Sequence, residues 1–188
     1  MFSKLKNKIL NILFFARNIN AARRVFEIKR GTFGDFVFRG YSPVDVGSIA
    51  AIYQELNGGA VFSRLQRKLY MRIGRRCLFV VESMDMFGVS RIIAMNMYYF
   101  NRRDIRDNTV HEGFIGVLPE FGGRGIATKM RKMAVEHFSV SGFSGISTRI
   151  TLDNTASLVS ARKIGFQPVE KYEEPATGEQ RYYMICKF

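Results

Sequence analysis

The sequence of 188 residues predicts an α+β, or mixed α/β, domain in which helices flank a central, mostly antiparallel twisted sheet of about seven strands. Two observations lead to this prediction. Residues 77–82 and 90–100 are apolar runs on either side of a turn, which is the pattern of an antiparallel hairpin. Further along, a strand, a glycine-rich loop, a helix and another strand follow one another over residues 109–152, which is the order of a crossover connection.

Residues 1–30 read as a basic extension before the main domain, which we place at residues 31–188. The extension holds eight basic residues and one acidic residue, Glu27. A basic amphipathic helix of this kind can pack on its own domain, form a dimer contact, lie on an anionic membrane or contact nucleic acid. Within residues 2–25 the apolar side chains recur at helical spacing, at Leu5, Ile9, Ile12, Leu13, Ala16 and Ile19.

The first half of the main domain alternates between turn signals and apolar runs. Residues 35–39 read as a first strand. Ser42, which a proline follows, is a candidate N-cap for a helix over residues 43–56. A second helix, rich in basic residues, is expected over residues 60–73 and would end at Gly74. Two strands at 77–82 and 90–100 and a polar turn at 101–108 complete this half.

The second half contains the crossover and the last two strands. Asp153 or Asn154 is expected to cap a helix that runs to Lys163, and Gly165 would end that helix. The other expected elements are a strand at 109–117, a loop at 118–125, a helix at 126–138, and strands at 146–152, 167–172 and 181–187.

Charge and cysteine usage narrow the class of protein. The net charge of +13 predicts an anionic partner, such as a nucleotide, CoA, nucleic acid or acidic lipid. The longest early apolar run, Ile9 to Ala16, is too short to span a bilayer. Cys77 and Cys186 each lie in an apolar run and read as buried free thiols on strands, which favours a cytoplasmic location. With two His residues and no Cys/His cluster, we expect no metal site.

The loop after the strand at 109–117 carries the clearest chemical signal. Gly122, Gly123 and Gly125 allow the backbone to approach a ligand closely and to adopt positive φ. The first turn of the following helix offers unpaired N–H groups and the positive end of the helix dipole. Such a loop suits a pyrophosphate, with Arg124 as a nearby cation. It is neither a P-loop nor a dinucleotide fingerprint, because its spacing fits neither pattern.

Two motifs resemble one family. The stretch Val117-Leu-Pro-Glu-Phe-Gly-Gly-Arg-Gly-Ile-Ala127 is similar to the acetyl-CoA loop of the GNAT acyltransferase superfamily. The stretch from Asn154 to Phe166 resembles the helix of that superfamily that ends in Lys-x-Gly-Phe. The resemblance covers roughly residues 35–188 and implies a GNAT-like fold and acetyl-CoA as cosubstrate.

The resemblance also implies roles for individual residues. The backbone of Ile115, Gly116 and Val117 would bind the pantetheine arm, and so would Asn154. The amides of Gly122, Gly123, Arg124, Gly125, Ile126 and Ala127 would bind the pyrophosphate. The chain departs from the family at two positions. Gly122 replaces the usual Gln or Arg, and Ala161 replaces the Tyr that often protonates the departing thiolate. Ser157, Ser160, a Tyr from another element or water would then have to supply that proton.

The catalytic base and the acceptor site are less clearly marked. His111 and Glu112 are adjacent on a strand, so they point to opposite faces and only one of them is expected in the cleft. We take His111 as base or substrate binder, because its ordinary pKa suits neutral pH, with Glu112 as the other candidate and structural roles as the alternative for both. Arg64 and Arg67 on the basic helix would either contact an anionic acceptor or form a solvated face. Tyr99 would contact the acceptor or pack on the sheet.

Three functions fit these features. The first is an N-acetyltransferase for a primary amine of an anionic small molecule, such as a nucleotide-linked amino sugar. The second is acetylation of a macromolecular amine, namely a protein N-terminus, a lysine or aminoacyl-tRNA. The third is a non-catalytic acyl-CoA-binding protein. Nucleic acid is the less favoured partner, because the basic residues do not alternate with aromatic ones. A peripheral membrane contact through residues 1–25 and a homodimer remain open.

Overall fold

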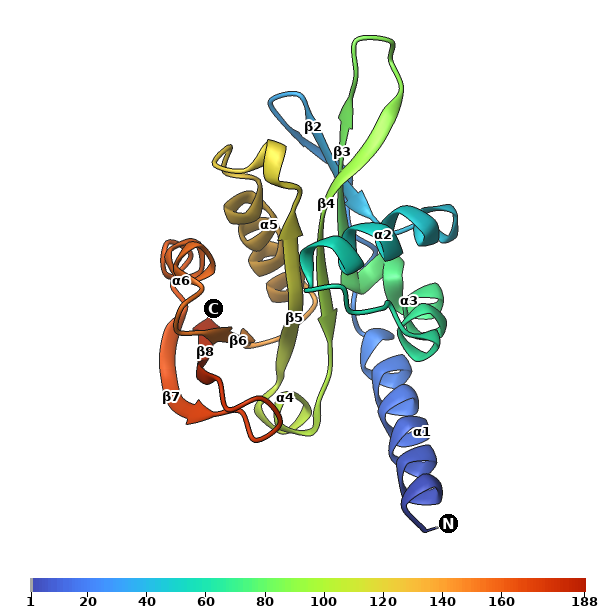
Figure 1. The fold of residues 1–188 in the computed structure, drawn as a ribbon, viewed down its shortest axis with the longest axis vertical. Helices are drawn as coiled ribbons and strands as arrows, with labels where there is room; N and C mark the ends of the chain where they lie inside the picture. The colour runs from blue at the N-terminus through green and yellow to red at the C-terminus, as the bar shows by residue number, and fades with distance from the viewer. Residues whose placement is uncertain (1) are drawn as a thin grey trace.

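The computed structural model describes residues 2–188, so Met1 lies outside it (Figure 1). Its centre is one eight-stranded sheet in the order β1-β2-β3-β4-β5-β6-β8-β7. All neighbouring strands are antiparallel except the parallel pair β5 and β6. The strands are β1 (Gly31–Phe33), β2 (Phe36–Gly40), β3 (Leu78–Met84), β4 (Ser90–Tyr99), β5 (Thr109–Val117), β6 (Gly145–Thr151), β7 (Gln167–Glu173) and β8 (Gln180–Lys187). The mixed, mostly antiparallel sheet is confirmed.

Helices cover both faces of this sheet. On one face, α2 and α3 lie against β4 and its neighbours, and on the other α5 lies behind β4, β5 and β6 (Figure 1). Tyr99 and Tyr98 show the two faces, because Tyr99 lines a cavity with α2 and α3 whereas Tyr98 contacts Phe138 of α5. The helices are α1 (Phe2–Ala22), α2 (Val46–Leu56), α3 (Arg64–Cys77), α4 (Arg102–Asp107), α5 (Ile126–Val140) and α6 (Thr155–Arg162), with single turns η1 (Pro43–Asp45) and η2 (Pro119–Phe121).

Two predicted boundaries of the basic helix were wrong. The helix α3 begins after its N-cap Ser63, later than expected, and it continues through Gly74 to Cys77. Gly74 lies inside the helix, where it leaves room for the Tyr41 ring. A Cβ atom at this position would lie 2.4 Å from Cδ1 of Tyr41. Cys77 is therefore the last helical residue rather than the start of a strand, although it is a buried free thiol as expected.

Two further segments differ from the prediction. The polar stretch 101–108 contains the short helix α4, in which the Asn101 side chain accepts from the backbone N–H of Asp104 and caps the helix. The sequence did not predict this helix, because it is only six residues long and its mostly charged residues show no apolar period. Residues 31–33 form β1, which pairs with β2 across Gly34 and was not predicted. It is three residues long, below the length at which alternation is visible.

The predicted N-terminal helix is present, and its second half is fixed to the domain. The buried Asn18 side chain donates to the carbonyl oxygens of Phe14 and Phe100 and accepts from the Phe100 N–H at 2.7 Å. Arg76 of α3 donates to the carbonyl of Ala22. The first half of α1 extends away from the sheet toward the N-terminus, as Figure 1 shows. No helix within residues 2–188 is both long and apolar enough to cross a membrane.

Candidate active site

The parallel strands β5 and β6 separate, and this separation forms a cleft. They pair from Thr109 opposite Gly145 as far as Glu112 opposite Thr148. Beyond that point β5 continues to Val117 beside β4 alone. Residues 113–117 of β5 therefore present backbone N–H and C=O groups that have no partner strand on the β6 side, and these residues are partly exposed. Such an edge can hydrogen-bond the amides of an extended ligand. It contains all three strand residues predicted to hold pantetheine, Ile115, Gly116 and Val117.

The glycine-rich loop follows directly on this free edge. Gly123 and Gly125 have φ of 72° and 77°, which is a conformation that favours glycine. The first hydrogen bond of α5 runs from the Lys129 N–H to the carbonyl of Gly125, so the N–H groups of Arg124 to Thr128 lie before it. No carboxylate lies in the first turn of the helix. Amides at a helix start, with no carboxylate in the first turn of that helix, would suit an anion.

Cations border this loop. Arg124 is exposed, and its guanidinium lies 5.4 Å from the centre of the Phe121 ring. Lys129 of α5 points over Phe33. Gly122 donates its N–H to the Pro119 carbonyl, and a Cβ atom there would lie 3.0 Å from that oxygen. The absence of a side chain at residue 122 therefore fits the tight turn. Arg124 carries a positive charge in the same loop.

A cavity of about 260 Å³ occupies the cleft between β5, β6 and α6. Asn154 lines it and caps α6, because its Oδ1 accepts from the Ser157 N–H at 3.0 Å. Ser157 lines the same cavity, and its hydroxyl accepts a hydrogen bond from Arg131. Ser160 lies elsewhere, with its hydroxyl 3.3 Å from that of Thr128 in the first turn of α5. Ala161 is fully buried, so this position faces the core and not the cleft.

Glu112 and Arg131 form a buried ion pair at the floor of this cavity. The two side chains are each 1% exposed, and the N–O distance is 2.7 Å. Asn96 and Tyr98 also donate to the Glu112 carboxylate. Burial raises the pKa of Glu112, but the charge and hydrogen bonds of Arg131 outweigh this effect, so the pKa is lowered. Glu112 is therefore an ionised carboxylate whose lone pairs are largely occupied.

His111 points to the opposite face from Glu112, as the strand geometry requires. It is 2% exposed, and its ring lies 4.9 Å from the centre of the Tyr99 ring. Its Nδ1 atom is 2.7 Å from the hydroxyl of Ser147, which donates to Asp104. Because the Ser147 proton is used in that bond, Nδ1 must be the donor, and Nε2 carries the lone pair. Burial lowers the pKa of His111 to about 4, against an opposing effect of Asp104.

A second cavity, of about 250 Å³, adjoins the cleft on this face, and we call it the acceptor cavity. Gly113 and Phe114 line both cavities. The lining comes from α1, α2, α3, β4 and β5: Phe14, Tyr53, Gln66, Leu69, Tyr70, Met97, Tyr99, Gly113 and Phe114. Tyr99 thus lines this cavity, whereas Arg64 and Arg67 are exposed on α3 and line neither cavity. The sequence did not predict that Phe14, Tyr53 and Gly113 would line a cavity. Of the three, only Gly113 gave a signal, since a glycine inside a strand often marks a bulge or a close approach.

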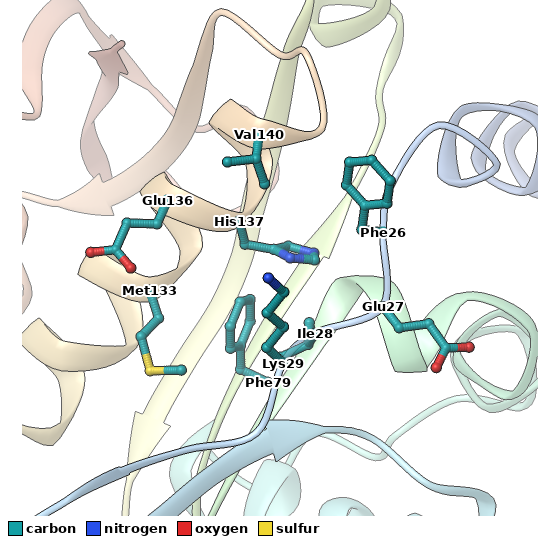
Figure 2. Close-up of a pocket in the computed structure, with 9 residues that line it drawn as sticks. All are labelled: Phe26, Glu27, Ile28, Lys29, Phe79, Met133, Glu136, His137 and Val140. Carbon is teal, nitrogen blue, oxygen red and sulfur yellow. The ribbon is translucent and has the colours of Figure 1, made fainter.

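A larger cavity lies far from this site. It measures about 650 Å³ and is lined by residues 26–29, Phe79 and the second half of α5 (Figure 2). Met133, His137 and Val140 of α5 point into it, but no residue of the cleft or of the acceptor cavity lines it. His137 is held there by a hydrogen bond to the Arg76 carbonyl. We do not assign the reaction to this cavity, because neither the free edge of β5 nor the glycine-rich loop lines it.

The comparisons with known proteins agree with this geometry. No curated protein matches the chain significantly. Among solved structures, the fold is similar to that of Arabidopsis thaliana NAA60 in complex with acetyl-CoA, with a TM-score of 0.71 at 13% identity over 81% of this chain and 99% of that chain. It is also similar to the putative acetyltransferase yncA from Salmonella typhimurium with acetyl-CoA, with a TM-score of 0.65 at 15% identity over 81% of this chain and 94% of that chain.

A third similar structure is the NatC complex bound to Gag peptide and CoA, with a TM-score of 0.70 at 12% identity over 82% of this chain and 99% of that chain. The model of the acetyltransferase (GNAT) family matches residues 49–166, which is more than half of the chain. This match includes the free edge of β5, the glycine-rich loop and the helix that Asn154 caps. The chain therefore belongs to the GNAT family and is an acetyl-CoA-dependent acetyltransferase.

Proposed function

We propose that this acetyltransferase modifies the terminal amine of a peptide or protein whose first side chain is apolar. The observation that supports this proposal is the acceptor cavity, which joins the cleft at Gly113 and Phe114. Its lining is aromatic and aliphatic, with Gln66 as its one amide side chain and no charged residue. Such a cavity stabilises an apolar side chain and disfavours a phosphate or a carboxylate, because a charge there would lose its hydration.

The comparisons support a peptide acceptor without deciding it. The NatC structure of similar fold is bound to a peptide and to CoA. A second similar structure, of Arabidopsis thaliana NAA60, is in complex with a bisubstrate analogue. In this chain, a peptide amine that reached the cleft would pass Tyr99 and Tyr53, which lie on opposite elements of the acceptor cavity.

The residues of the cleft would divide the work of the reaction. Bound acetyl-CoA supplies an activated acetyl group, which the amine attacks directly. The free edge of β5 would hold the pantetheine arm, and the amides before Lys129 would hold the pyrophosphate. We assign the proton acceptor to His111, which lines neither cavity but packs against Tyr99 of the acceptor cavity. Its imidazole is neutral above its lowered pKa, and Ser147 sets its tautomer. The Ser157 hydroxyl, which lines the cleft, would donate a hydrogen bond to the leaving thiolate, and water would supply the proton that the thiolate takes up.

Glu112 and Ser160 fit other roles better. The occupied oxygens of Glu112 favour a structural role, in which it neutralises Arg131 under the cleft. Ser160 bonds to Thr128 and would steady the contact between α5 and α6. We also infer that the enzyme works in the cytoplasm, because Cys77 and Cys186 are buried free thiols.

A second acceptor class is supported by the cations of the cleft. Arg149 is exposed in the cleft wall and has no ion-pair partner within residues 2–188. Arg181 lines the same cavity, but its guanidinium is paired with Glu174 and Glu179. Arg149 would therefore be the cation that pairs with the diphosphate of a nucleotide-linked amino sugar.

The test compares acceptors in one assay of thiol release from acetyl-CoA. The panel contains peptides that differ only in the first residue, with Met, Leu, Ser and Glu at that position, together with nucleotide-linked amino sugars and polyamines. We expect the highest kcat/KM for the peptides that begin with Met or Leu. Preference for the amino sugars, lost in Arg149→Ala, would support the second class instead. Equal rates for the Leu and Glu peptides would contradict the assignment of the acceptor cavity.

A further inference from the structure

Helix α1 carries a second apolar face that nothing in the described chain covers. Leu5, Ile9, Ile12 and Leu13 recur at the spacing of one helix face, and they are 56%, 49%, 58% and 47% exposed. We call these four residues the outer stripe. The residues that fix α1 to the domain, Phe14 and Asn18, lie on the other side of the helix. Helix α1 therefore packs on the domain through one face and leaves the outer stripe, which lies on the opposite face, exposed.

Basic side chains border the outer stripe. Lys6 and Lys8 fall on its two sides, since each residue is turned by about 100° from the one before it. No acidic residue occurs anywhere in α1. A helix with an exposed apolar stripe between lysines has the composition of a helix that lies in the interface of a membrane.

The neighbouring helix α3 extends the same charge. It also contains no acidic residue, and Arg64, Lys68 and Arg72 recur along its exposed face. We call these three residues the basic face. It adjoins α1, because Lys68 and Leu65 line a shallow groove together with Lys8 and Ile12. At the end of α3, Arg75 has one exposed acidic neighbour, Glu27, at 3.9 Å, which is too weak a pair to cancel the charge.

We propose that the outer stripe and the basic face together dock this enzyme on an anionic phospholipid surface. A bilayer with anionic headgroups is the partner that satisfies both features at once, since acyl chains accept the leucines and isoleucines while headgroups pair with the lysines and arginines. A second copy of this chain would bring two surfaces of like charge together. A nucleic acid would pair with the basic face but would leave the outer stripe in water.

Helix α1 connects the outer stripe to the acceptor cavity. The outer stripe lies on the part of α1 that extends from the domain toward the N-terminus (Figure 1). Phe14, the residue directly after Leu13, lines the acceptor cavity from the other side of the helix. The helix that would bind the membrane therefore also forms a wall of that cavity.

The experiment is co-sedimentation of the full chain with vesicles of phosphatidylcholine, with and without phosphatidylglycerol. We expect binding that needs phosphatidylglycerol and weakens with added salt. The stripe variant Ile9→Asp with Ile12→Asp should lose at least about tenfold in partition. The charge variant Lys68→Glu with Arg72→Glu should lose the preference for phosphatidylglycerol. All four side chains are exposed, so both variants should keep the thermal unfolding midpoint of the unaltered chain.

A matched control uses valines of similar exposure at other sites. Val159 on α6 and Val169 on β7 are 46% and 54% exposed, and Val159→Asp with Val169→Asp should bind vesicles as well as the unaltered chain. Three results would overturn the proposal: no binding to either vesicle, equal binding by the stripe variant, or equal loss in the valine control. Light scattering gives a fourth, because a dimer that the stripe variant converts to a monomer would make the outer stripe an interface between two copies.

Discussion

Tyr99 lies directly over Gly113, so closely that a Cβ atom at Gly113 would come within 2.3 Å of Cε1 of the Tyr99 ring. Gly113 stands at a β-bulge, where the register between β4 and β5 shifts between Met97 and Tyr98. The bulge lies where β5 leaves β6, and the glycine allows the Tyr99 ring to rest against the strand. The Tyr99 ring therefore lines the acceptor cavity beside Gly113, where that cavity adjoins the cleft.

We predict that Gly113→Ala impairs acceptor binding. The new methyl group must displace Tyr99, at a cost of about 1–3 kcal/mol, and the ring would move into the acceptor cavity. The KM for the acceptor should rise roughly tenfold, while the dissociation constant of acetyl-CoA changes little. Steady-state kinetics and calorimetry measure the two. Adding Tyr99→Leu removes the clash and should restore much of the thermal stability. An unchanged KM in Gly113→Ala would show that Tyr99 does not border the acceptor path.

We predict that Gly125→Ala in the glycine-rich loop selectively lowers the affinity for acetyl-CoA. Gly125 has φ of 77°, so alanine there is strained and the first turn of α5 would shift. We expect acetyl-CoA to bind about tenfold more weakly, measured by calorimetry. Gly178→Ala is the matched control, because Gly178 has φ of 72° with nothing near its side-chain position and lies in a turn far from the loop. Equal losses in both variants would point to general destabilisation.

The buried pair of Glu112 and Arg131 predicts a loss of stability rather than of chemistry. Glu112→Gln leaves the Arg131 guanidinium buried without its counter-ion, which should lower the free energy of unfolding by about 3–5 kcal/mol. Urea unfolding measures this loss. The double variant Glu112→Leu with Arg131→Met removes both charges and should be more stable than Glu112→Gln. If Glu112→Gln keeps its stability but loses turnover, Glu112 would be the base after all.

His111 predicts a pH-dependent stability. In the unfolded chain the imidazole gains a proton near its ordinary pKa of 6.5, whereas in the folded protein it remains neutral down to about 4. Between these values the unfolded state binds more protons, so the free energy of unfolding should fall as the pH falls from 6.5 to 4, by roughly 3 kcal/mol. His111→Asn should remove this part, as measured by urea unfolding across the range. His137, whose pKa burial also lowers, contributes in the same direction, and His137→Asn isolates that contribution.

A catalytic role for His111 has its own signature. If His111 accepts the amine proton, His111→Ala should lower kcat by about 100-fold with little change in acetyl-CoA affinity. Ser147→Ala removes the hydroxyl that fixes the tautomer and should lower kcat less. Single-turnover rates with the best peptide of the panel separate this effect from acceptor binding. Unchanged turnover in His111→Ala, in a protein that is still folded, would leave the ring as packing for Tyr99.

Much of the site was predictable because its chemistry is local. Strand, glycines and helix follow one another between Val117 and Ala127, so the sequence determined the anion site before any tertiary contact was known. Asn154 was predictable for the same reason, since an N-cap acts within three residues of its own position. The alternation of His111 and Glu112 between two faces also follows from the strand alone.

Tertiary structure decided what lies around that loop. The acceptor cavity takes its walls from Phe14, Tyr53, Tyr70 and Tyr99, which stand on four elements far apart in the chain, and no short-range pattern connects them. The same holds for the Glu112–Arg131 pair, which converts a candidate base into a buried counter-ion. Arg64 and Arg67 are exposed on α3 and line neither cavity, because the rotation of α3 is set by its apolar contacts and not by its charges. The glycine-rich loop depends on hydrogen bonds between residues close in the chain, so the sequence alone determined it. Burial depends on the whole fold, so only the tertiary structure decided which side chains line the acceptor cavity.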